Sequence, residues 1–224
     1  MSTDHGPLSM EAIDAVVFDL DGVLIDSERI YLQAWLKVAE EIACPELGPA
    51  YTQVVGLPYD EIEPIVEKIL NDKVSMTDFR AAMMGAVGKQ LTNGYPLKTG
   101  AMEILQFLQS QGVPCAVATS STTSVPVKLQ DTGIGHFFCH VVTRDEVARG
   151  KPHPDVYLKA AEQLGLAPSR CLAVEDSEPG LQAALASGMQ VVHVPDIIIV
   201  SSDLTAACRA ICSDLLALRD WLTA

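Results

Sequence analysis

The chain has 224 residues, of which 49% are hydrophobic and 20% are charged, and its formal net charge is −14. These values describe an ordinary globular protein that is long enough to bury a substantial core. The negative charge argues against nucleic acid or an anionic membrane surface as a main partner, but it leaves room for a small anionic substrate at a local positive site.

The chain opens with about ten polar residues that lack the apolar stretch of a signal peptide, and its most apolar later run, Ile197–Val200, is too short to span a bilayer. We therefore expect a cytoplasmic protein, with a monomer as the plainest form. The six cysteines include no Cys-x-x-Cys pair. In a chain of this size we expect them to be reduced thiols rather than a disulfide framework.

The first predicted element is a buried strand over about Ala15–Asp19, which ends in carboxylates. Asp19 and Asp21 are two residues apart, so on an extended backbone their side chains point to the same side. Gly22 permits a sharp turn directly after them. Two neighbouring buried carboxylates are costly unless a cation accompanies them, and a divalent cation with oxygen ligands would meet that need. The alternative is a strand end with ordinary acidic turn residues.

A helical stretch follows this strand. Apolar residues at helical spacing predict helices from about residue 27, over Tyr59–Ile69 and over Met76–Val87, and we predict no strand between about 28 and 95. A βαβ unit needs only about 30 residues, so this gap is far longer than a crossover requires. The excess predicts a small helical domain inserted at the carboxyl edge of a sheet, where it could act as a mobile lid. The alternative is an insertion elsewhere on the surface.

From about residue 97, predicted strands and helices alternate. The strands are Val113–Thr119, His140–Thr143, Cys171–Glu175 and Gln190–Val194, and the helices are Ala101–Gln111, Val125–Asp131, Asp155–Leu164 and Leu181–Ser187. This alternation predicts an α/β fold, a Rossmann-like parallel sheet with helices on both faces, plus the inserted all-α domain. The predicted core domain covers 1–27 and 96–224, and the predicted helical domain covers 28–95.

Polar side chains follow four of the predicted strands, at ends that meet at one edge of a parallel sheet. Phosphoryl transfer needs a nucleophile, charge neutralisation and hydrogen-bond donors, and these residue types supply all three. The hydroxyl of Thr119 and nearby backbone N–H groups can bind phosphoryl oxygens, and Lys151 supplies a fixed cation. Asp19, Glu175 and Asp176 offer the hard oxygen ligands that suit Mg²⁺. One carboxylate could attack phosphorus while another protonates the leaving oxygen and later activates water.

Four segments, in this order, resemble the four motifs of the haloacid dehalogenase superfamily: Asp19–Glu28, Val117–Ser121, Gly150–Asp155 and Val174–Ser177. The helical insertion resembles the cap of the β-phosphoglucomutase-like phosphatase branch. The resemblance covers nearly the whole chain. It implies a Mg²⁺-dependent phosphatase that hydrolyses a small phosphorylated metabolite, such as a sugar phosphate, through an aspartyl-phosphate.

The same resemblance implies roles for individual residues. Asp19 would be the nucleophile, and Asp21 would be the general acid and base. Thr119, Ser120 and Lys151 would bind the phosphoryl group, and Lys151 would also shield Asp19.

The metal ligands implied by the resemblance lie after the first and fourth strands of the core. Mg²⁺ would be held by Asp19, by Asp21 through its backbone carbonyl, and by Glu175 and Asp176.

Substrate choice is expected to depend on the helical domain. Gly56 lies in a segment that resembles the specificity loop of the cap, and Arg80 is a cation that could face substrate; the alternatives are a plain turn and a solvated surface charge. A sugar-phosphate mutase is a second functional hypothesis, although Tyr31 stands about where the mutase branch typically carries a histidine. A non-catalytic binding protein is a third, but no catalytic position is replaced.

Overall fold

The computed structural model of the chain describes residues 12–55 and 59–224. It divides into two compact units, one formed by residues up to Asp26 together with Pro96–Ala224, and one formed by Ser27–Tyr95. The predicted division placed the first junction one residue later, between residues 27 and 28. Ser27 instead begins the first helix of the second unit.

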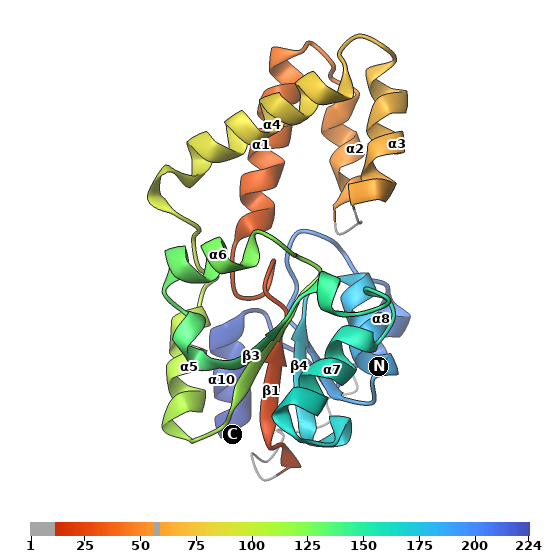
Figure 1. Cartoon of the computed structure of the whole chain (residues 1–224). Helices are drawn as coiled ribbons and strands as arrows, with labels where there is room; N and C mark the ends of the chain where they lie inside the picture. The colour runs from red at the N-terminus through yellow and green to blue at the C-terminus, as the bar shows by residue number, and fades with distance from the viewer. Residues whose placement is uncertain (1–11, 56–58) are drawn as a thin grey trace. The chain divides into compact units, whose positions relative to one another are not determined.

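A six-stranded sheet forms the centre of the first unit (Figure 1). Its strands are β1 (Ala15–Phe18), β2 (Cys115–Ala118), β3 (Phe138–Val142), β4 (Cys171–Glu175), β5 (Gln190–His193) and β6 (Ala210–Ile211). The strand order is β3-β2-β1-β4-β5-β6, and every neighbouring pair is parallel. The order therefore reverses between β1 and β4, and in open α/β sheets ligands bind at the carboxyl ends of strands beside such a reversal.

Helices cover both faces of this sheet. They are α5 (Ala101–Ser110), α6 (Val125–Thr132), α7 (Asp155–Leu164), α8 (Glu178–Ala186), α9 (Ser202–Ala207) and α10 (Leu215–Thr223). Figure 1 shows α7 and α8 on one side of the sheet and α5 and α10 on the other. Strands β1 and β2 are buried along their whole length, and Val17 packs in one cluster with Tyr157 of α7 and Leu181 of α8. The predicted Rossmann-like α/β architecture is confirmed.

The sequence pattern did not predict three α-helices and one strand that the structure contains, namely α2 (Leu47–Val54), α9, α10 and β6. Helix α2 contains Gly48 and Pro49, which lower helix propensity and read as a turn. Its residues Leu47, Ala50, Tyr51 and Val54 are nevertheless buried, so tertiary packing stabilises a helix that local propensity does not favour.

The second unit consists of helices α1 (Ser27–Glu41), α2, α3 (Tyr59–Leu70) and α4 (Met76–Gln90). Trp35 lies at the centre of its core. The indole N–H of Trp35 donates to the carbonyl of Leu47 at 2.6 Å, and its ring meets the rings of Tyr51 and Phe79 edge-on at centroid distances of 5.7 and 5.5 Å. This unit therefore has a hydrophobic core of its own.

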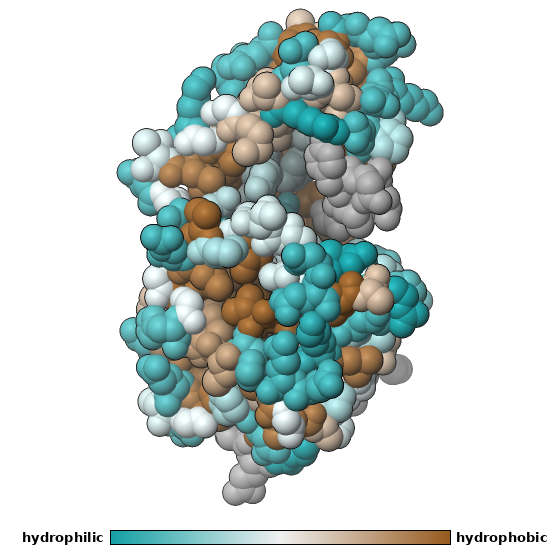
Figure 2. Space-filling model, in the orientation of Figure 1, coloured by the Kyte–Doolittle hydropathy of each residue, from teal (hydrophilic) through white to brown (hydrophobic). Residues whose placement is uncertain are grey.

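The surface of each unit mixes hydrophilic and hydrophobic residues on the face that Figure 2 shows. The large apolar side chains exposed among the described residues are spread over separate segments: Leu36, Met84, Val127, Leu158, Ile199 and Ile211. Within residues 12–55 and 59–224, no helix is both long and apolar enough to cross a bilayer.

All six cysteines are free thiols, as the sequence predicts, and Cys139 is exposed. Burial raises the pKa of the Cys115 thiol to about 12 and that of the Cys171, Cys208 and Cys212 thiols to about 11. Because the thiolate is the reactive form, these four side chains should resist alkylation.

Brief treatment with iodoacetamide at pH 8 should therefore modify Cys139 first. Peptide mass spectrometry locates the label, and the same treatment in urea should modify all six cysteines. Rapid native labelling of Cys115 or Cys171 would contradict the burial described here.

The first turn of helix α8 packs against the side chain of Glu175, the last residue of β4. The Ser177 side chain accepts a hydrogen bond from the backbone N–H of Gly180 at 3.2 Å and caps the helix. A Cβ atom on Gly180 would lie 1.8 Å from Oε1 of Glu175. Only glycine therefore allows the buried Glu175 carboxylate to lie against this first turn.

Gly180→Ala should lower the free energy of unfolding by about 1–3 kcal/mol, because the added methyl group overpacks a buried site. Gly85→Ala in helix α4 is the matched control, since a Cβ there meets nothing within 4 Å. This control should raise the free energy of unfolding by about 0.5–1 kcal/mol. Urea unfolding measures both, and a Gly180→Ala protein as stable as the parent would show that the close approach is wrong.

Candidate active site

Lys151 joins the ends of the two central strands. It lies in the loop between β3 and α7, and its Nζ donates to Oδ1 of Asp19 at 2.5 Å and also to Oε1 of Glu175. Asp19 directly follows β1 and Glu175 ends β4, so the lysine bridges the strands at which the sheet order reverses. The structure thus brings together three predicted site residues that lie far apart in the sequence.

The ammonium group of Lys151 is firmly charged. Its side chain is only 4% exposed, and burial opposes the charged form, but the Asp19 and Glu175 carboxylates outweigh burial and raise the pKa of Lys151. Nζ also lies 5.1 Å from the centroid of the Tyr157 ring, within the range of a cation–π contact. The site therefore holds a permanent buried cation.

Glu175 is saturated with hydrogen bonds. Its Oε1 accepts from Lys151 and from the Tyr157 hydroxyl at 3.0 Å. Its Oε2 accepts from the backbone N–H groups of Asp176 and Ser177 at 2.9 and 3.0 Å, and from the Ser177 hydroxyl at 3.2 Å. Burial by itself would raise the pKa of Glu175. Lys151 and these donors outweigh that effect, so the pKa lies below its usual value and the side chain is a carboxylate.

Two further carboxyl groups, those of Asp19 and Asp176, would carry more negative charge when ionised than Lys151 alone can offset. Burial raises the pKa of Asp19 to about 8, with Lys151 opposing and Glu175 reinforcing the rise. Burial, followed by the charges of Glu175 and Asp19, raises the pKa of Asp176 well above its usual range. A nucleophilic Asp19 must be ionised near neutral pH, so the site calls for additional positive charge.

Asp176 lies against the turn that follows Asp19. Gly22 has a φ of +84°, and a Cβ there would come within 2.3 Å of Oδ2 of Asp176. Oδ1 of Asp176 is buried and has no hydrogen-bond partner in the part of the chain that the structure describes. Such an orphaned buried oxygen beside an excess of negative charge fits a hard divalent cation.

The side chains do not stand in a closed ligand cage. Among the described residues, no three His, Cys, Asp or Glu side chains converge closely enough to hold a metal ion as they stand. The oxygen donors of Asp19, Asp176 and Glu175 suit Mg²⁺ chemically, but Glu175 is already bound by protein donors. These residues therefore match Mg²⁺ in the type and the charge of their donor atoms, and not in a converged arrangement of their side chains.

Asp21 is held by residues of the neighbouring loop and helix. Its Oδ2 accepts from the Ser121 hydroxyl at 2.6 Å, and its Oδ1 accepts from Nζ of Lys128 at 2.5 Å. Lys128 lies on α6, and its side chain is 3% exposed, whereas that of Asp21 is 18% exposed. The backbone N–H of Gly22 donates to the carbonyl of Ile25 at 2.9 Å and closes the turn beyond Asp21.

The predicted phosphate-binding residues follow β2, the neighbour of β1. Thr119 is buried, and its Oγ1 accepts from the backbone N–H of Ser121 at 3.0 Å. Ser120 is exposed. Because Phe18 pairs with Val117 across the strands, these residues follow the same sheet edge as Asp19.

Two residues of this network were missed by the sequence analysis, Lys128 and Tyr157. Lys128 lies three residues after the buried Val125 on α6, and this spacing places it on the core-facing side. A charged residue at a core-facing helix position is the sequence feature that could have identified Lys128. Tyr157 lies inside an ordinary apolar helix pattern, which carries no sign of its contact with Glu175.

The two predicted specificity residues belong to the second unit. Gly56 lies outside the described residues. The guanidinium of Arg80 lies 2.6 Å from a carboxylate oxygen of Glu63, with both side chains partly exposed. The pairing fits the alternative reading of Arg80 as a solvated surface charge, and the specificity role stays a prediction.

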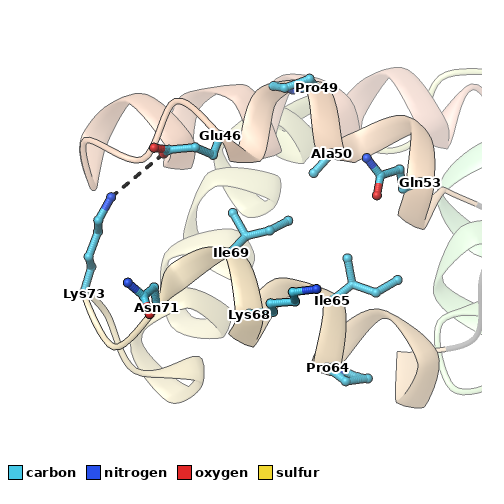
Figure 3. A pocket seen from close by; sticks show the side chains of 10 residues that line it. All are labelled: Glu46, Pro49, Ala50, Gln53, Pro64, Ile65, Lys68, Ile69, Asn71 and Lys73. Atoms are coloured by element: carbon cyan, nitrogen blue, oxygen red, sulfur yellow. Dashed lines mark ion pairs between the residues drawn. The ribbon is translucent and has the colours of Figure 1, made fainter.

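A groove of about 710 Å³ lies between helices α2 and α3 of the second unit (Figure 3). Its lining includes Pro49, Gln53, Ile65, Lys68 and Ile69, and none of the predicted site residues. We therefore do not assign the chemistry to this groove.

Lys151→Met should lower the free energy of unfolding by about 3–5 kcal/mol, because it leaves two carboxylates buried without their cation. Arg149→Met, two residues away, is the control: its ion pair with Asp155 at 2.9 Å is exposed, and its loss should cause no measurable change. Urea unfolding followed by circular dichroism measures both variants. Equal stability of the two would contradict a buried cation at this position.

A model of the haloacid dehalogenase-like hydrolase family matches residues 13–188. The phosphorylated carbohydrates phosphatase of Thermotoga maritima is 30% identical over 182 residues, which cover 81% of this chain and 84% of that protein. The β-phosphoglucomutase of Bacillus subtilis is 30% identical over 190 residues, covering 80% and 82%.

A solved structure supports the same relationship. The HAD family hydrolase from Deinococcus radiodurans R1, with bound phosphate and sodium, is 31% identical, has a TM-score of 0.77, and aligns over 95% of this chain and 98% of that one. Fold, strand-end residues and sequence similarity agree, and the chain belongs to the haloacid dehalogenase-like hydrolase family.

Proposed function

We propose that this hydrolase is a phosphatase that cleaves a small phosphorylated metabolite, a sugar phosphate, through phosphoryl transfer to Asp19 with Mg²⁺ as cofactor. The observation that carries the proposal is the contact of Asp19 with Lys151 at 2.5 Å, which pairs a buried carboxylate with a fixed cation at the sheet reversal. The T. maritima relative, named for phosphorylated carbohydrates, supports the substrate class.

Asp19 and Asp21 would divide the chemistry. An Asp19 oxygen forms a bond to phosphorus while the bond from phosphorus to the leaving oxygen breaks, and Asp21 donates a proton to that oxygen. Asp21 then takes a proton from water, whose oxygen attacks the aspartyl-phosphate. Inorganic phosphate leaves, and the Asp19 carboxylate is restored.

The other residues would bind the transferred group and balance its charge. Lys151, the Thr119 hydroxyl and the backbone N–H of Ser120 would contact the phosphoryl oxygens. Mg²⁺, held by Asp19, the Asp21 carbonyl, Glu175 and Asp176, would supply charge neutralisation as a Lewis acid. Because protein donors already occupy both Glu175 oxygens, we also assign Glu175 the task of anchoring Lys151.

We also propose that the helical unit is a cap that selects the substrate, with Gly56 and Arg80 as selectivity positions. A sugar-phosphate mutase is the second candidate. Tyr31, in place of the histidine typical of mutases, favours hydrolysis over transfer between sugar hydroxyls.

Asp19→Asn should lower turnover of p-nitrophenyl phosphate by about 1,000-fold or more, because the amide cannot act as the nucleophile. EDTA should abolish activity of the parent enzyme, and added Mg²⁺ should restore it. Phosphate release is the measurement.

Asp14→Asn is the matched control for this experiment. Asp14 lies just before β1, at its amino end, where its partly exposed carboxylate pairs with Arg170 at 2.5 Å. Its loss should leave turnover unchanged. Activity that survives Asp19→Asn would remove the proposed mechanism.

A further inference from the structure

Lys128, Ser121 and the proposed acid–base residue Asp21 are linked in a ring of three hydrogen bonds. Its Nζ donates to Oδ1 of Asp21 at 2.5 Å and to the Ser121 hydroxyl at 3.2 Å, and that hydroxyl donates to Oδ2 of Asp21 at 2.6 Å. Both carboxylate oxygens of Asp21 are therefore held, one by an ammonium and one by a hydroxyl. The three residues come from the turn after β1, the loop after β2 and helix α6.

We propose that Lys128 is a positioning residue for proton transfer by Asp21. It fixes the side-chain orientation of Asp21 and determines which carboxylate oxygen exchanges the proton with substrate. This inference rests on the proposed function, in which Asp21 protonates the leaving oxygen.

The burial of the two partners argues for this role. The Lys128 side chain is 3% exposed, but the Asp21 side chain is 18% exposed and within reach of water. A partly hydrated carboxylate at a turn does not need a buried lysine for its own solvation, and burying the ammonium is itself costly. A role in fixing Asp21 in one rotamer explains why the ammonium of Lys128 is buried despite this cost, because proton transfer requires a defined geometry.

The two donors are chemically different, and this difference selects one oxygen. An ammonium group has no lone pair, so it cannot accept a hydrogen bond from a protonated Oδ1. The Ser121 hydroxyl can either donate or accept, so it can stay bonded to Oδ2 with or without a proton there. Oδ2 is therefore the oxygen that carries the proton to the leaving group while Oδ1 remains on Lys128.

The proposal can be tested with two aryl phosphates of similar shape, p-nitrophenyl phosphate and phenyl phosphate. The p-nitrophenolate leaving group needs little protonation, whereas phenolate needs much more. The value of kcat/KM reports phosphoryl transfer to Asp19, the step in which Asp21 acts as an acid. Lys128→Met should lower kcat/KM for phenyl phosphate about tenfold more than for p-nitrophenyl phosphate, and Lys128→Arg should recover part of that selective loss.

Three controls separate positioning from a structural role. Lys159→Met, at a partly exposed lysine of α7, should leave both substrates unaffected. Inhibition by inorganic phosphate should be unchanged in Lys128→Met if the phosphate site is intact. Ser121→Ala removes the other holder of Asp21 and should show a smaller selective loss; it also provides the test if Lys128→Met does not fold.

The outcomes are distinguishable. Equal losses on both substrates in a folded Lys128 variant would overturn the inference while leaving the proposed function standing. If Asp21→Asn itself shows no dependence on the leaving group, the assigned role of Asp21 fails and the inference fails with it. In the double variant of Asp21→Asn with Lys128→Met, the selectivity should be no larger than in Asp21→Asn alone.

Discussion

The contact of Lys151 with Asp19 and Glu175 is the interaction on which the rest of the site depends. A buried ammonium between two carboxylates is stable only if both anions stay in place, and a buried carboxylate is ionised only if a cation stays beside it. The strand ends of β1 and β4 are therefore fixed relative to each other by charge as well as by backbone hydrogen bonds. Any chemistry at Asp19 occurs in the electric field of this one lysine.

The packing around the site serves the same ion pair. Glycines at two positions bring carboxylates close to backbone, Asp176 against Gly22 and Glu175 against Gly180. The Tyr157 hydroxyl completes the hydrogen bonding of Glu175. Rigid neighbours of this kind hold charged groups in one arrangement, which is how an enzyme avoids reorganising its environment during the reaction.

The two aspartates after β1 each have a lysine of their own. Asp19 faces Lys151, and Asp21 faces Lys128. Two carboxylates two residues apart would otherwise have similar environments and could not easily take different roles. In the proposed mechanism, the Lys151 cation favours the ionised, nucleophilic form of Asp19, and the partly hydrated, hydroxyl-linked setting of Asp21 suits proton exchange.

The α/β alternation, the helical insertion and the strand-end residues can be predicted from the amino-acid sequence, because hydrophobic periodicity and strand-end chemistry are local. Lys128 lies 107 residues from Asp21 in the sequence, and Tyr157 lies 18 residues from Glu175, so neither contact falls within one local element. Helix α2, with its glycine and proline, also forms through burial that no short window contains. These features depend on tertiary contacts, because a charge or a helix that is unfavourable locally becomes stable only when other segments of the chain supply its partners.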